Sequence, residues 1–412
     1  MRVLLVSYPE KTHFLAMAPL AWALRTAGHE AVFAGQPRFA QVINQAGLTA
    51  VPIGRDSDQA RMMELDRNVA ASGRTGLPEP YDVAEAPERA TWEYLSAAYR
   101  QATTWWHKME NLPLIPDLVE FARGWRPDLV VWEPTTFAGA IAARACGAAH
   151  ARLLFGPDVY GVTRAHFLRL KGEHGKDPLA EWLGSYVHFG EDLVTGHFTI
   201  DQLPPSLTLR ADGLRYVPLR FTPYGGPSVV PGWLQAPPGK PRIALTLGLV
   251  ATERFDGYTL DPQDVLTALD GLDVELVATL PEHEQRKLTH IPANTRLVPY
   301  VPLQALAPTL AAVIHHAGFG TLATTAQHSI PQLVVPGDTD SPAIARRLAR
   351  QGSAITLPHP TPAAIRERLQ RLLTDPAYAE RAGSLAAEIH AAPTPNDLIP
   401  HLEDLTAHYR AQ

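Results

Sequence analysis

The chain has 412 residues, of which 46% are hydrophobic and 19% are charged, and its formal net charge is −6. This composition is typical of a globular protein, and an acidic balance without a lysine- or arginine-rich block gives no support for nucleic acid as a partner. Cys146 is the single cysteine. A chain with one cysteine cannot form intramolecular disulfides or cysteine-built zinc or iron–sulfur sites, and this low cysteine content fits a reducing compartment.

The start of the chain and its apolar runs bear on localisation. Met1 and Arg2 lead directly into an apolar run, so a signal peptide is not expected. No apolar run reaches the roughly 18 residues that are needed to span a bilayer. We therefore expect a cytoplasmic protein without stable membrane insertion.

Residues 3–53 alternate between predicted strands and helices. Residues 3–6 form a continuous apolar run, which is typical of a strand buried on both faces of a parallel sheet. The elements predicted after it are a helix at 14–27, a strand at 30–34, a helix at 39–46 and a strand at 48–53. This order indicates an α/β fold with a doubly wound parallel sheet. Because no Gly-x-Gly-x-x-Gly follows the first strand, a dinucleotide-binding dehydrogenase loses support.

The remainder of the N-terminal half is less regular. Residues 56–89 mix charge with Gly, Pro and Ser and lack a clear period, so we expect a long surface loop or lid there. The further predicted elements are a helix at 90–123, a strand at 127–133, a helix at 137–146, a strand at 149–155 and helices at 164–171 and 179–188. Trp92, Trp105 and Trp106 lie along the first of these helices, and packing in a core or interface is the more usual role of such aromatics.

A proline-rich segment divides the chain at residues 215–240. It contains six prolines and four glycines, a composition that continues neither a helix nor a sheet. The length of the chain predicts two domains of about 200 residues each. We expect an N-terminal domain at 1–214, the linker at 215–240, a C-terminal domain at 241–395, and a last helix at 396–412 that packs back on the N-terminal domain. A cleft between two such domains is the expected ligand site, because ligands of open α/β sheets bind at the carboxyl ends of the strands.

The C-terminal half contains a second α/β series. Its predicted elements are strands at 242–247, 274–279 and 295–300, helices at 261–271 and 303–310, and helices at 361–374, 376–390 and 396–412. Between them, residues 311–357 predict strand, glycine turn, helix, strand, turn, helix and strand in succession.

The glycine turn within 311–357 has the features of a phosphate site. A helix N-terminus offers free backbone N–H groups and a partial positive charge, which favour an anion. Gly318 and Gly320 let the backbone approach a ligand closely, while His316 adds a donor or a positive charge and Thr321 adds a hydroxyl. Two ordinary strand-to-helix turns, with glycines that serve only the backbone angles, explain the same pattern.

The motif His315-His316-Ala317-Gly318-Phe319-Gly320-Thr321 resembles the His-His-Gly-Gly-x-Gly-Thr signature of GT-B-fold glycosyltransferases that use nucleotide-activated sugars on natural products. The chain is most similar to actinomycete macrolide and anthracycline glycosyltransferases, which move TDP-activated deoxysugars or aminosugars onto polyketide aglycones. Further matching segments are 330–332 with Pro336, 19–30, 125–130, 132–134, 149–154 and 226–231. The resemblance implies two Rossmann-like domains that face each other across a cleft.

The resemblance also assigns residues to the donor. It implies that the diphosphate is held by His316, Gly318, Gly320, Thr321, Gly248, Thr252, Gly226 and Pro227. It places the nucleobase against the backbone at Val301, although this apolar side chain fits a core position equally well. Asp340 and Ser341 are implied at the donor sugar. Ser341 replaces the glutamine of many relatives, so a sugar with few hydroxyls is favoured. Leu249-Val250-Ala251 replaces the serine with which relatives help to hold the phosphate after Gly248, and Thr252 is the nearest hydroxyl.

His13 and Glu133 are the candidate catalytic pair. His13 follows the first strand, where the family places its general base, and an imidazole pKa near about 6.5 suits proton transfer at neutral pH. An isolated surface histidine is the alternative. Glu133 ends its own parallel strand, where related sequences often carry an acid that orients the histidine. A structural role for Glu133 is equally compatible, because glutamate is longer than the usual aspartate.

No metal site is expected. Asp338-Thr339-Asp340 has the spacing of a metal-binding Asp-x-Asp motif, but this pair opens a helix and two acids at this spacing are common by chance. We therefore expect no cofactor, with a TDP-sugar as co-substrate.

The sequence thus predicts an inverting, metal-independent glycosyltransferase that moves a deoxysugar or aminosugar from TDP to a hydroxyl of a polyketide-type aglycone in antibiotic biosynthesis. One alternative is a catalytically silent GT-B protein that binds a nucleotide sugar or a partner enzyme, and another is a sugar-nucleotide epimerase. The resemblance further suggests a P450-like auxiliary protein on the N-terminal domain and allows a homodimer.

Overall fold

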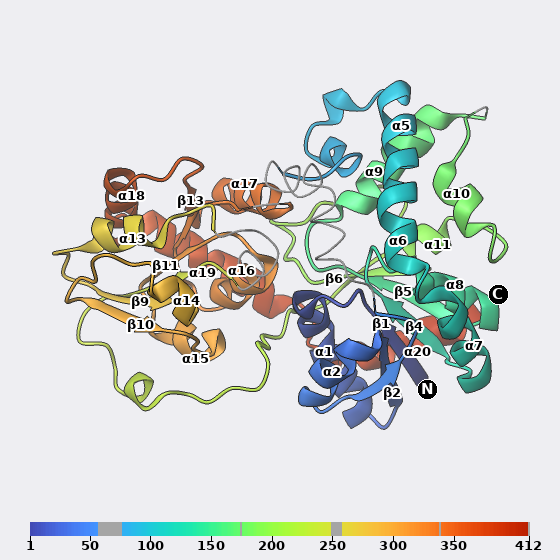
Figure 1. Ribbon diagram of the computed structural model, residues 1–412, viewed down its shortest axis with the longest axis horizontal. Coiled ribbons are helices and arrows are strands. Elements are labelled where there is room, and N and C mark those ends of the chain that lie inside the picture. The colour runs from blue at the N-terminus through green and yellow to red at the C-terminus, as the bar shows by residue number, and fades with distance from the viewer. Residues whose placement is uncertain (57–75, 174, 249–257, 338, 411–412) are drawn as a thin grey trace.

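The computed structural model describes residues 1–56, 76–173, 175–248, 258–337 and 339–410. Within these ranges the strands form two parallel sheets, one in each half of the chain (Figure 1). The first sheet contains β1 (Arg2–Val6), β2 (Glu30–Gly35), β3 (Thr49–Pro52), β4 (Leu129–Trp132), β5 (Ala149–Leu153), β6 (Phe198–Asp201) and β7 (Tyr216–Pro218). The second contains β8 (Arg242–Thr246), β9 (Glu275–Thr279), β10 (Thr295–Val298), β11 (Ala312–His315), β12 (Gln332–Val334) and β13 (Ala354–Thr356).

Both sheets have the strand order of doubly wound folds. The first runs β3-β2-β1-β4-β5-β6-β7 and the second runs β10-β9-β8-β11-β12-β13. In each sheet the order reverses beside the first strand of that half, and such a switch point opens a crevice at the carboxyl ends of the strands. The predicted α/β fold with two Rossmann-like parallel sheets is therefore confirmed.

Helices cover both faces of the sheets. In the first half these are α1 (Lys11–Thr26), α2 (Ala40–Gln45), α5 (Trp92–Ala102), α6 (Lys108–Asn111), α7 (Ile115–Trp125), α8 (Phe137–Cys146), α9 (Val159–Lys171), α10 (Pro178–Leu183) and α11 (Asp192–Thr195). In the second half they are α13 (Pro262–Leu269), α14 (Glu282–Gln285), α15 (Leu303–Leu306), α16 (Phe319–Ala326), α17 (Ser341–Gln351), α18 (Pro362–Thr374), α19 (Pro376–Ala391) and α20 (Pro395–Arg410). None of the helices in the described ranges is both long and apolar enough to cross a membrane.

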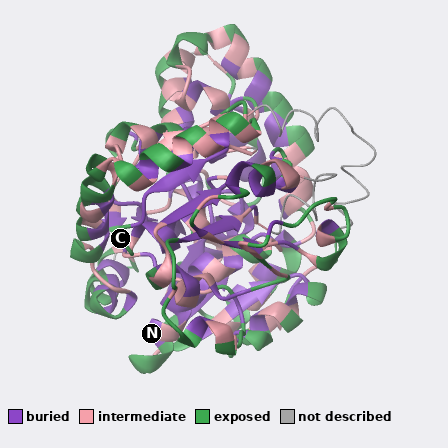
Figure 2. Cartoon of the chain, turned by 90° about the vertical axis from the view of Figure 1, so that its left-hand side faces the viewer, coloured by how far each residue is buried: buried purple, intermediate pink, exposed green. Residues whose placement is uncertain are grey.

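The strand β1 shows why its apolar run is uninterrupted. Val3 and Leu5 pack into the core layer that contains α1 and α20, whereas Leu4 and Val6 pack into the opposite layer with α7 and α8. All four side chains are buried, so a polar residue would be desolvated on either face. Figure 2 shows the same arrangement, with buried strands in the interior and partly exposed helices around them.

The last helix, α20, returns to the first half of the chain. Leu398 and Leu402 lie in the same core layer as Phe14 of α1. Near its C-terminal end, Arg410 forms an ion pair with Asp128, which precedes β4. The chain therefore ends against the sheet in which it begins, as the red helix beside the blue strands in Figure 1 shows.

Three local predictions are wrong. The first helix begins at Lys11 and not at residue 14, so His13 lies in its first turn and not in a preceding loop. Residues 216–218, placed in a linker that continues no sheet, form the edge strand β7, where a proline is tolerated because one edge carries no ladder. The strand β6 was not predicted.

The predicted surface loop at 56–89 is also partly wrong. Residues 57–75 lie outside the described part of the chain, but Tyr81–Ala84 and Pro87–Arg89 form short 3-10 helices. Tyr81 and Val83 are buried, and Val83 packs in a core layer of the first sheet. The predicted helix at 90–123 is interrupted by a π-helical turn at Thr103–His107.

Candidate active site

The predicted site residues follow the central strands of the two sheets. In the first half, His13 follows β1 and Glu133 follows β4. In the second half, Gly248 follows β8 and His316 follows β11. These strands are neighbours within their sheets, so each pair is brought to the switch point of its own sheet.

The turn after β11 is held by His315. The Ala317 N–H donates to His315 Nδ1 at 3.1 Å, and His315 Nε2 lies 2.7 Å from Gln332 Oε1. Because Nδ1 accepts a hydrogen bond, the neutral ring carries its proton on Nε2, and this N–H donates a hydrogen bond to the amide oxygen of Gln332. Burial lowers the pKa of His315 to about 3. Ala317, the next residue but one, has a φ of 68°, a left-handed conformation that the surrounding contacts must hold.

The His316 ring lies between two glycines from different turns. A Cβ on Gly248 would lie 2.7 Å from His316 Cε1, and a Cβ on Gly318 would overlap Nε2 of the same ring. Side chains at both glycines would therefore displace the imidazole. Burial lowers the pKa of His316 to about 4, against an opposing contribution from the Thr246 backbone. The imidazole is neutral at pH 7, so it can act as a hydrogen-bond donor and not as a fixed positive charge.

The other residues of this turn lie at the start of α16. Gly318 is the N-cap of the helix, and its backbone is extended there. Gly320 is exposed, and a Cβ on it would meet open space; Thr321 is half-buried. The turn thus brings His316, Gly318, Gly320 and Thr321 together at one helix N-terminus.

The second turn, before α17, contains Asp340 and Ser341. Ser341 is buried, and its hydroxyl accepts a hydrogen bond from the Gly337 N–H at 3.0 Å. The Gly337 N–H also faces the His316 carbonyl oxygen at 3.3 Å. The two turns of the C-terminal half are therefore joined directly, and the Ser341 hydroxyl is engaged within this arrangement.

The two halves of the chain meet at Asp340. Gly156, which follows β5 of the first sheet, lies so close that a Cβ on it would be 2.9 Å from Asp340 Oδ2. Asp340, which was predicted at the donor sugar, thus approaches a loop that follows a strand of the other sheet.

His13 lies in the first turn of α1 against an aromatic ring. Its imidazole is stacked on Phe155, with ring centroids 3.9 Å apart and an interplanar angle of 20°. Its Nδ1 lies 3.8 Å from Glu133 Oε2, which is longer than a hydrogen bond. The side chain remains 18% exposed, so one edge of the ring is open to an acceptor.

Glu133 is fully buried and is held by the start of α8. Its Oε1 accepts hydrogen bonds from the hydroxyls of Thr135, at 2.8 Å, and Thr136, while Oε2 accepts from the Thr135 N–H at 3.0 Å. Burial raises the pKa of Glu133, and these hydrogen bonds oppose the increase. Its polar contacts are therefore with its own turn and with the backbone of Tyr8, which follows β1.

Three other predicted site residues do not join the groups of residues described above. The Val301 side chain is buried in a core cluster with Leu234 and Leu306. Gly226 is buried and Pro227 is exposed in the segment beside Tyr300, whose hydroxyl lies 3.3 Å from the Gly225 carbonyl oxygen.

Two predicted or alternative residues fall outside the described part of the chain. These are Thr252, predicted at the diphosphate, and Asp338, the first acid of the Asp-x-Asp spacing.

Phe155 and Gly156 were missed by sequence reasoning. Their one signal was position, because they directly follow a buried strand of a parallel sheet. Nothing in their residue types pointed to the contacts that they make.

His150, Asp192 and His197 form a group of potential metal ligands in the described ranges. Their hydrogen bonds do not suit a metal. The Trp132 indole N–H donates to His150 Nδ1 at 3.2 Å, so the neutral His150 carries its proton on Nε2, 3.0 Å from Asp192. Asp192 is further paired with Arg144. The group is a satisfied hydrogen-bond network between β5 and α11.

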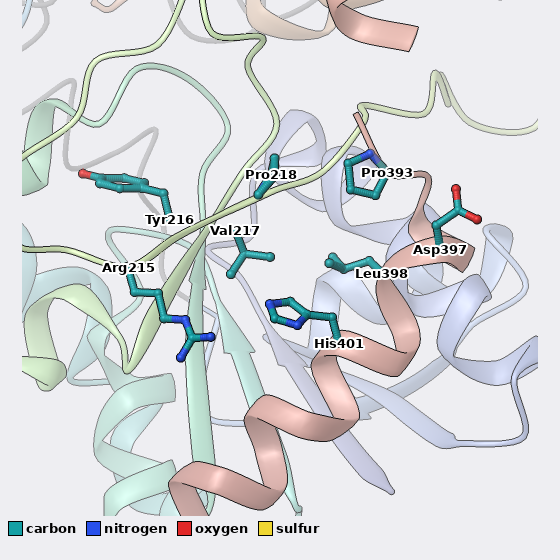
Figure 3. A pocket seen from close by; sticks show the side chains of 8 residues that line it. All are labelled: Arg215, Tyr216, Val217, Pro218, Pro393, Asp397, Leu398 and His401. Carbon is teal, nitrogen blue, oxygen red and sulfur yellow. The ribbon is translucent and has the colours of Figure 1, made fainter. Parts of the chain in front are cut away.

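A cavity of about 400 Å³ lies elsewhere, between β7 and the first turns of α20 (Figure 3). Its lining includes Arg215, Asp397 and His401, and none of the predicted site residues. Asp397 accepts hydrogen bonds from Thr394, which caps the helix. This cavity therefore belongs to the return of the chain to the first sheet and not to the candidate active site.

Family models match both halves of the chain. Residues 22–248 match the N-terminal domain of the erythromycin biosynthesis protein CIII-like family, and residues 263–405 match its C-terminal domain. The similar curated proteins include the 10-deoxymethynolide desosaminyltransferase of Streptomyces venezuelae, which is 43% identical over 100% of this chain and 98% of its own length. The TDP-daunosamine transferase DnrS of Streptomyces peucetius is 40% identical over 100% and 98%.

Solved structures agree with these matches. The glycosyltransferase VinC in complex with dTDP is 36% identical, covers 99% of this chain and 100% of its own, and has a TM-score of 0.87. The spinosyn forosaminyltransferase SpnP is 34% identical over 99% of both chains, with a TM-score of 0.81.

Proposed function

Because the chain belongs to the erythromycin biosynthesis protein CIII-like family of GT-B glycosyltransferases, we propose that it transfers a deoxysugar, in particular an aminodeoxysugar, from a TDP-sugar to a hydroxyl of a polyketide-type aglycone. Transfer proceeds with inversion and without a metal. The observation that carries the proposal is the full-length similarity to transferases named for desosamine and daunosamine. The placement of His13 and His316 at the carboxyl ends of two sheets supports it.

The reaction is a single displacement. His13 accepts the proton of the acceptor hydroxyl while that oxygen attacks the anomeric carbon of the sugar. The bond from the anomeric carbon to the diphosphate oxygen breaks, and TDP departs with the electron pair. The His316 N–H and the backbone N–H groups at the start of α16 stabilise the charge on the departing diphosphate. Attack from the face opposite the leaving group inverts the anomeric configuration.

Acceptance of one substrate pair tests the proposal directly. The purified protein is incubated with TDP-desosamine, TDP-mycaminose, TDP-daunosamine or TDP-rhodosamine, each with 10-deoxymethynolide, tylactone or aklavinone, and products are identified by mass spectrometry. Formation of a glycoside and TDP is expected from at least one pair. Binding of TDP-sugars without any turnover would favour a catalytically silent protein, and loss of TDP without an acceptor would favour an epimerase.

Metal independence is tested with the TDP-sugar and aglycone that give a product. Rates are expected to be unchanged in excess EDTA, since the donor half offers neutral donors at the diphosphate and Ser341 is occupied by Gly337. Loss of activity in EDTA that Mg²⁺ or Mn²⁺ restores would contradict metal independence and return attention to Asp338 and Asp340.

The proposal extends to a partner. A P450-like auxiliary protein on the N-terminal half would raise turnover when added in equimolar amount, and co-elution would accompany the increase. Full activity of the isolated chain, with no response to that protein, would contradict the need for it. Sedimentation at micromolar concentration would test a homodimer.

His13 provides the sharpest test of the mechanism. His13→Ala is expected to lower kcat by about 10²–10⁴-fold, the usual contribution of a general base. The affinity for TDP, measured by calorimetry, is expected to stay constant because the diphosphate turn belongs to the other half. The acidic limb of the pH–rate profile should disappear in the variant. An unchanged rate and limb would place the base elsewhere.

A further inference from the structure

The loop at residues 154–158 is held firmly at both ends. At its start, the Leu154 N–H donates to the Ile200 carbonyl at 2.9 Å, and Gln202 Nε2 donates to the Leu154 carbonyl at 3.0 Å. At its end, Asp158 is fully buried and accepts from Arg152 at 2.5 Å and from the Tyr216 hydroxyl at 2.7 Å. These contacts lie within the N-terminal half, so the loop is fixed without help from a ligand.

Phe155 projects from this loop onto the candidate base. Its ring is parallel to the His13 imidazole to within 20°, with centroids 3.9 Å apart. The carboxylate of Glu133 is 3.8 Å from His13 Nδ1 and is engaged by Thr135 and Thr136. Of the two aromatic rings that contact the imidazole, Phe155 is much the nearer, since the tilted Tyr8 ring lies 6.2 Å away, and a stacked ring at 3.9 Å constrains the plane of the imidazole.

Gly156, the next residue, faces the donor half. A Cβ at this position would lie 2.9 Å from Asp340 Oδ2, so the Asp340 carboxylate would have to move aside. The Cβ would also lie 4.0 Å from Ile344 Cδ1 of α17. A glycine here lets the loop approach the N-terminal end of α17 and its acid.

We propose that residues 155 and 156 position the two sides of the transfer site from one rigid loop. Phe155 orients the His13 ring toward the acceptor hydroxyl, and Gly156 sets the depth at which Asp340 meets the donor sugar. Both are positioning residues, since neither supplies a reacting group. The inference rests on the proposed function and adds to it the element that relates the base to the donor.

The first test is a double-mutant cycle between Phe155 and His13. Phe155→Leu keeps an apolar side chain but removes the flat ring, and it is expected to lower kcat by about 10-fold or more with little change in the KM of the TDP-sugar. Phe155→Tyr, which keeps the ring, is expected to retain most of the rate. In the His13→Ala background, Phe155→Leu should cause no further loss, because the residue acts through the imidazole.

Two outcomes would overturn the positioning role proposed for Phe155. Equal losses from Phe155→Leu with and without His13 would show that Phe155 acts through another group. An unchanged kcat in Phe155→Leu, with a melting temperature equal to that of the wild type, would show that stacking does not orient the base.

The second test concerns Gly156 and needs no turnover. Gly156→Ala is expected to weaken the binding of intact TDP-desosamine by at least about 5-fold in calorimetry, while TDP, which lacks the sugar, binds as before. Adding Asp340→Ala to Gly156→Ala should cause no further loss, since the sugar contact is already displaced. Equal affinity of Gly156→Ala and wild type for the TDP-sugar would overturn the assignment, as would an equal loss for TDP.

The proposed function and the positioning roles of Phe155 and Gly156 can fail separately. Absence of turnover with every donor and acceptor of the panel would contradict the proposed function, and the calorimetric comparison at Gly156 would still decide the positioning role. Turnover in the wild type with a neutral Phe155→Leu would leave the function in place and remove the inference for Phe155. TDP-mycaminose or TDP-daunosamine replaces TDP-desosamine in calorimetry if the panel selects it.

Discussion

Adjacent histidines at the end of β11 have different surroundings and therefore different roles. Both nitrogens of the His315 ring have partners within the fold, one from the Ala317 N–H and one at Gln332. His316 lies between Gly248 and Gly318, which come from two different turns, and its polar contact within the fold is with the Thr246 backbone. The first histidine shapes the turn, and the second is available to a ligand.

His316→Ala is expected to lower turnover by about 10²–10³-fold, the cost of removing one donor to a developing anion. His316→Gln is the matched variant, because its amide N–H can replace the donor without titrating, and it is expected to keep more activity than alanine. Turnover is measured with the most active TDP-sugar and aglycone. Wild-type rates in His316→Ala would show that the leaving group is stabilised elsewhere.

Glu133 is expected to act mainly on the fold. Since its two oxygens accept from Thr135 and Thr136, Glu133→Gln should lower the melting temperature and leave the acidic limb of the pH–rate profile in place. Thr136→Val, which removes a hydrogen bond to the same carboxylate, is the matched control and should behave in the same way. A downward shift of the limb in Glu133→Gln alone would mean that the carboxylate interacts with His13 across the 3.8 Å gap.

At the scale of elements, the sequence predicts what burial dictates and misses what tertiary contacts decide. The apolar runs of β1, β4, β8 and β11 were predictable because both faces of each strand are covered. The start of α1 was not, because its N-cap Glu10 makes no capping hydrogen bond with its side chain and the residues before it have loop composition. The edge strand β7 was hidden by Pro218 and by the proline-rich segment that follows it.

In the candidate active site too, local patterns were predictable from the sequence and contacts between distant elements were not. The motif at residues 315–321 identified the turn, because histidines and glycines beside a helix start are visible in one stretch of sequence. That Gly248 would lie against His316, or Phe155 against His13, depends on contacts between elements that are far apart in the chain. No local pattern encodes such contacts.

An ion pair connects the helix α17 to the N-terminal half of the chain. Glu85, which follows the short helix Tyr81–Ala84, bonds to Arg346 at 2.7 Å and also to Arg347. The N-terminal end of α17 contains Ser341 and follows Asp340. The ion pair therefore connects the segment before α5 to the part of the donor half that approaches Gly156.

Glu85→Gln is expected to raise the KM of the TDP-sugar by about 5-fold, which corresponds to about 1 kcal/mol, with a smaller change in kcat. The reason is that α17 loses its charged contact with the other half and holds the donor less firmly. Glu88→Gln, an exposed acid in the same segment, is the matched control and should be neutral. If both variants behave like the wild type, the ion pair does not contribute to donor binding.

For the whole molecule, the reaction requires both sheets at once. The proposed base lies beside the first sheet, in α1, and the proposed diphosphate site lies beside the second sheet, at the start of α16. The C-terminal helix α20 packs against the first sheet. The order of elements in each half was predictable from its own periodicity. The distance between the halves was not, because it depends on a few contacts such as Gly156 with Asp340 and Glu85 with α17.

Buried histidines in both halves make the fold sensitive to acid. Burial lowers the pKa of His107 and His315 to about 3 and that of His316 to about 4, and it also lowers the pKa of His150. Between these values and the ordinary histidine pKa, the unfolded chain binds more protons than the folded chain. Stability is therefore complete above the unfolded pKa of about 6.5 and is lost as the pH falls below it. Raised pKa values at Glu133 and Asp201 act in the opposite sense, but they are fewer.

We expect the melting temperature to fall by several degrees between pH 7.5 and pH 5.5 at constant ionic strength. At pH 5.5 each of His107, His315 and His316 contributes a loss of about 1 kcal/mol in the free energy of unfolding. His107→Gln, which removes one such histidine that is not among the proposed catalytic or donor residues, should lower the starting stability because the Tyr81 hydroxyl loses its 2.5 Å partner. It should also flatten the dependence on pH. A melting temperature that stays constant or rises over this interval would show that the histidines are protonated in the folded protein, and His316 would then approach the diphosphate as a cation.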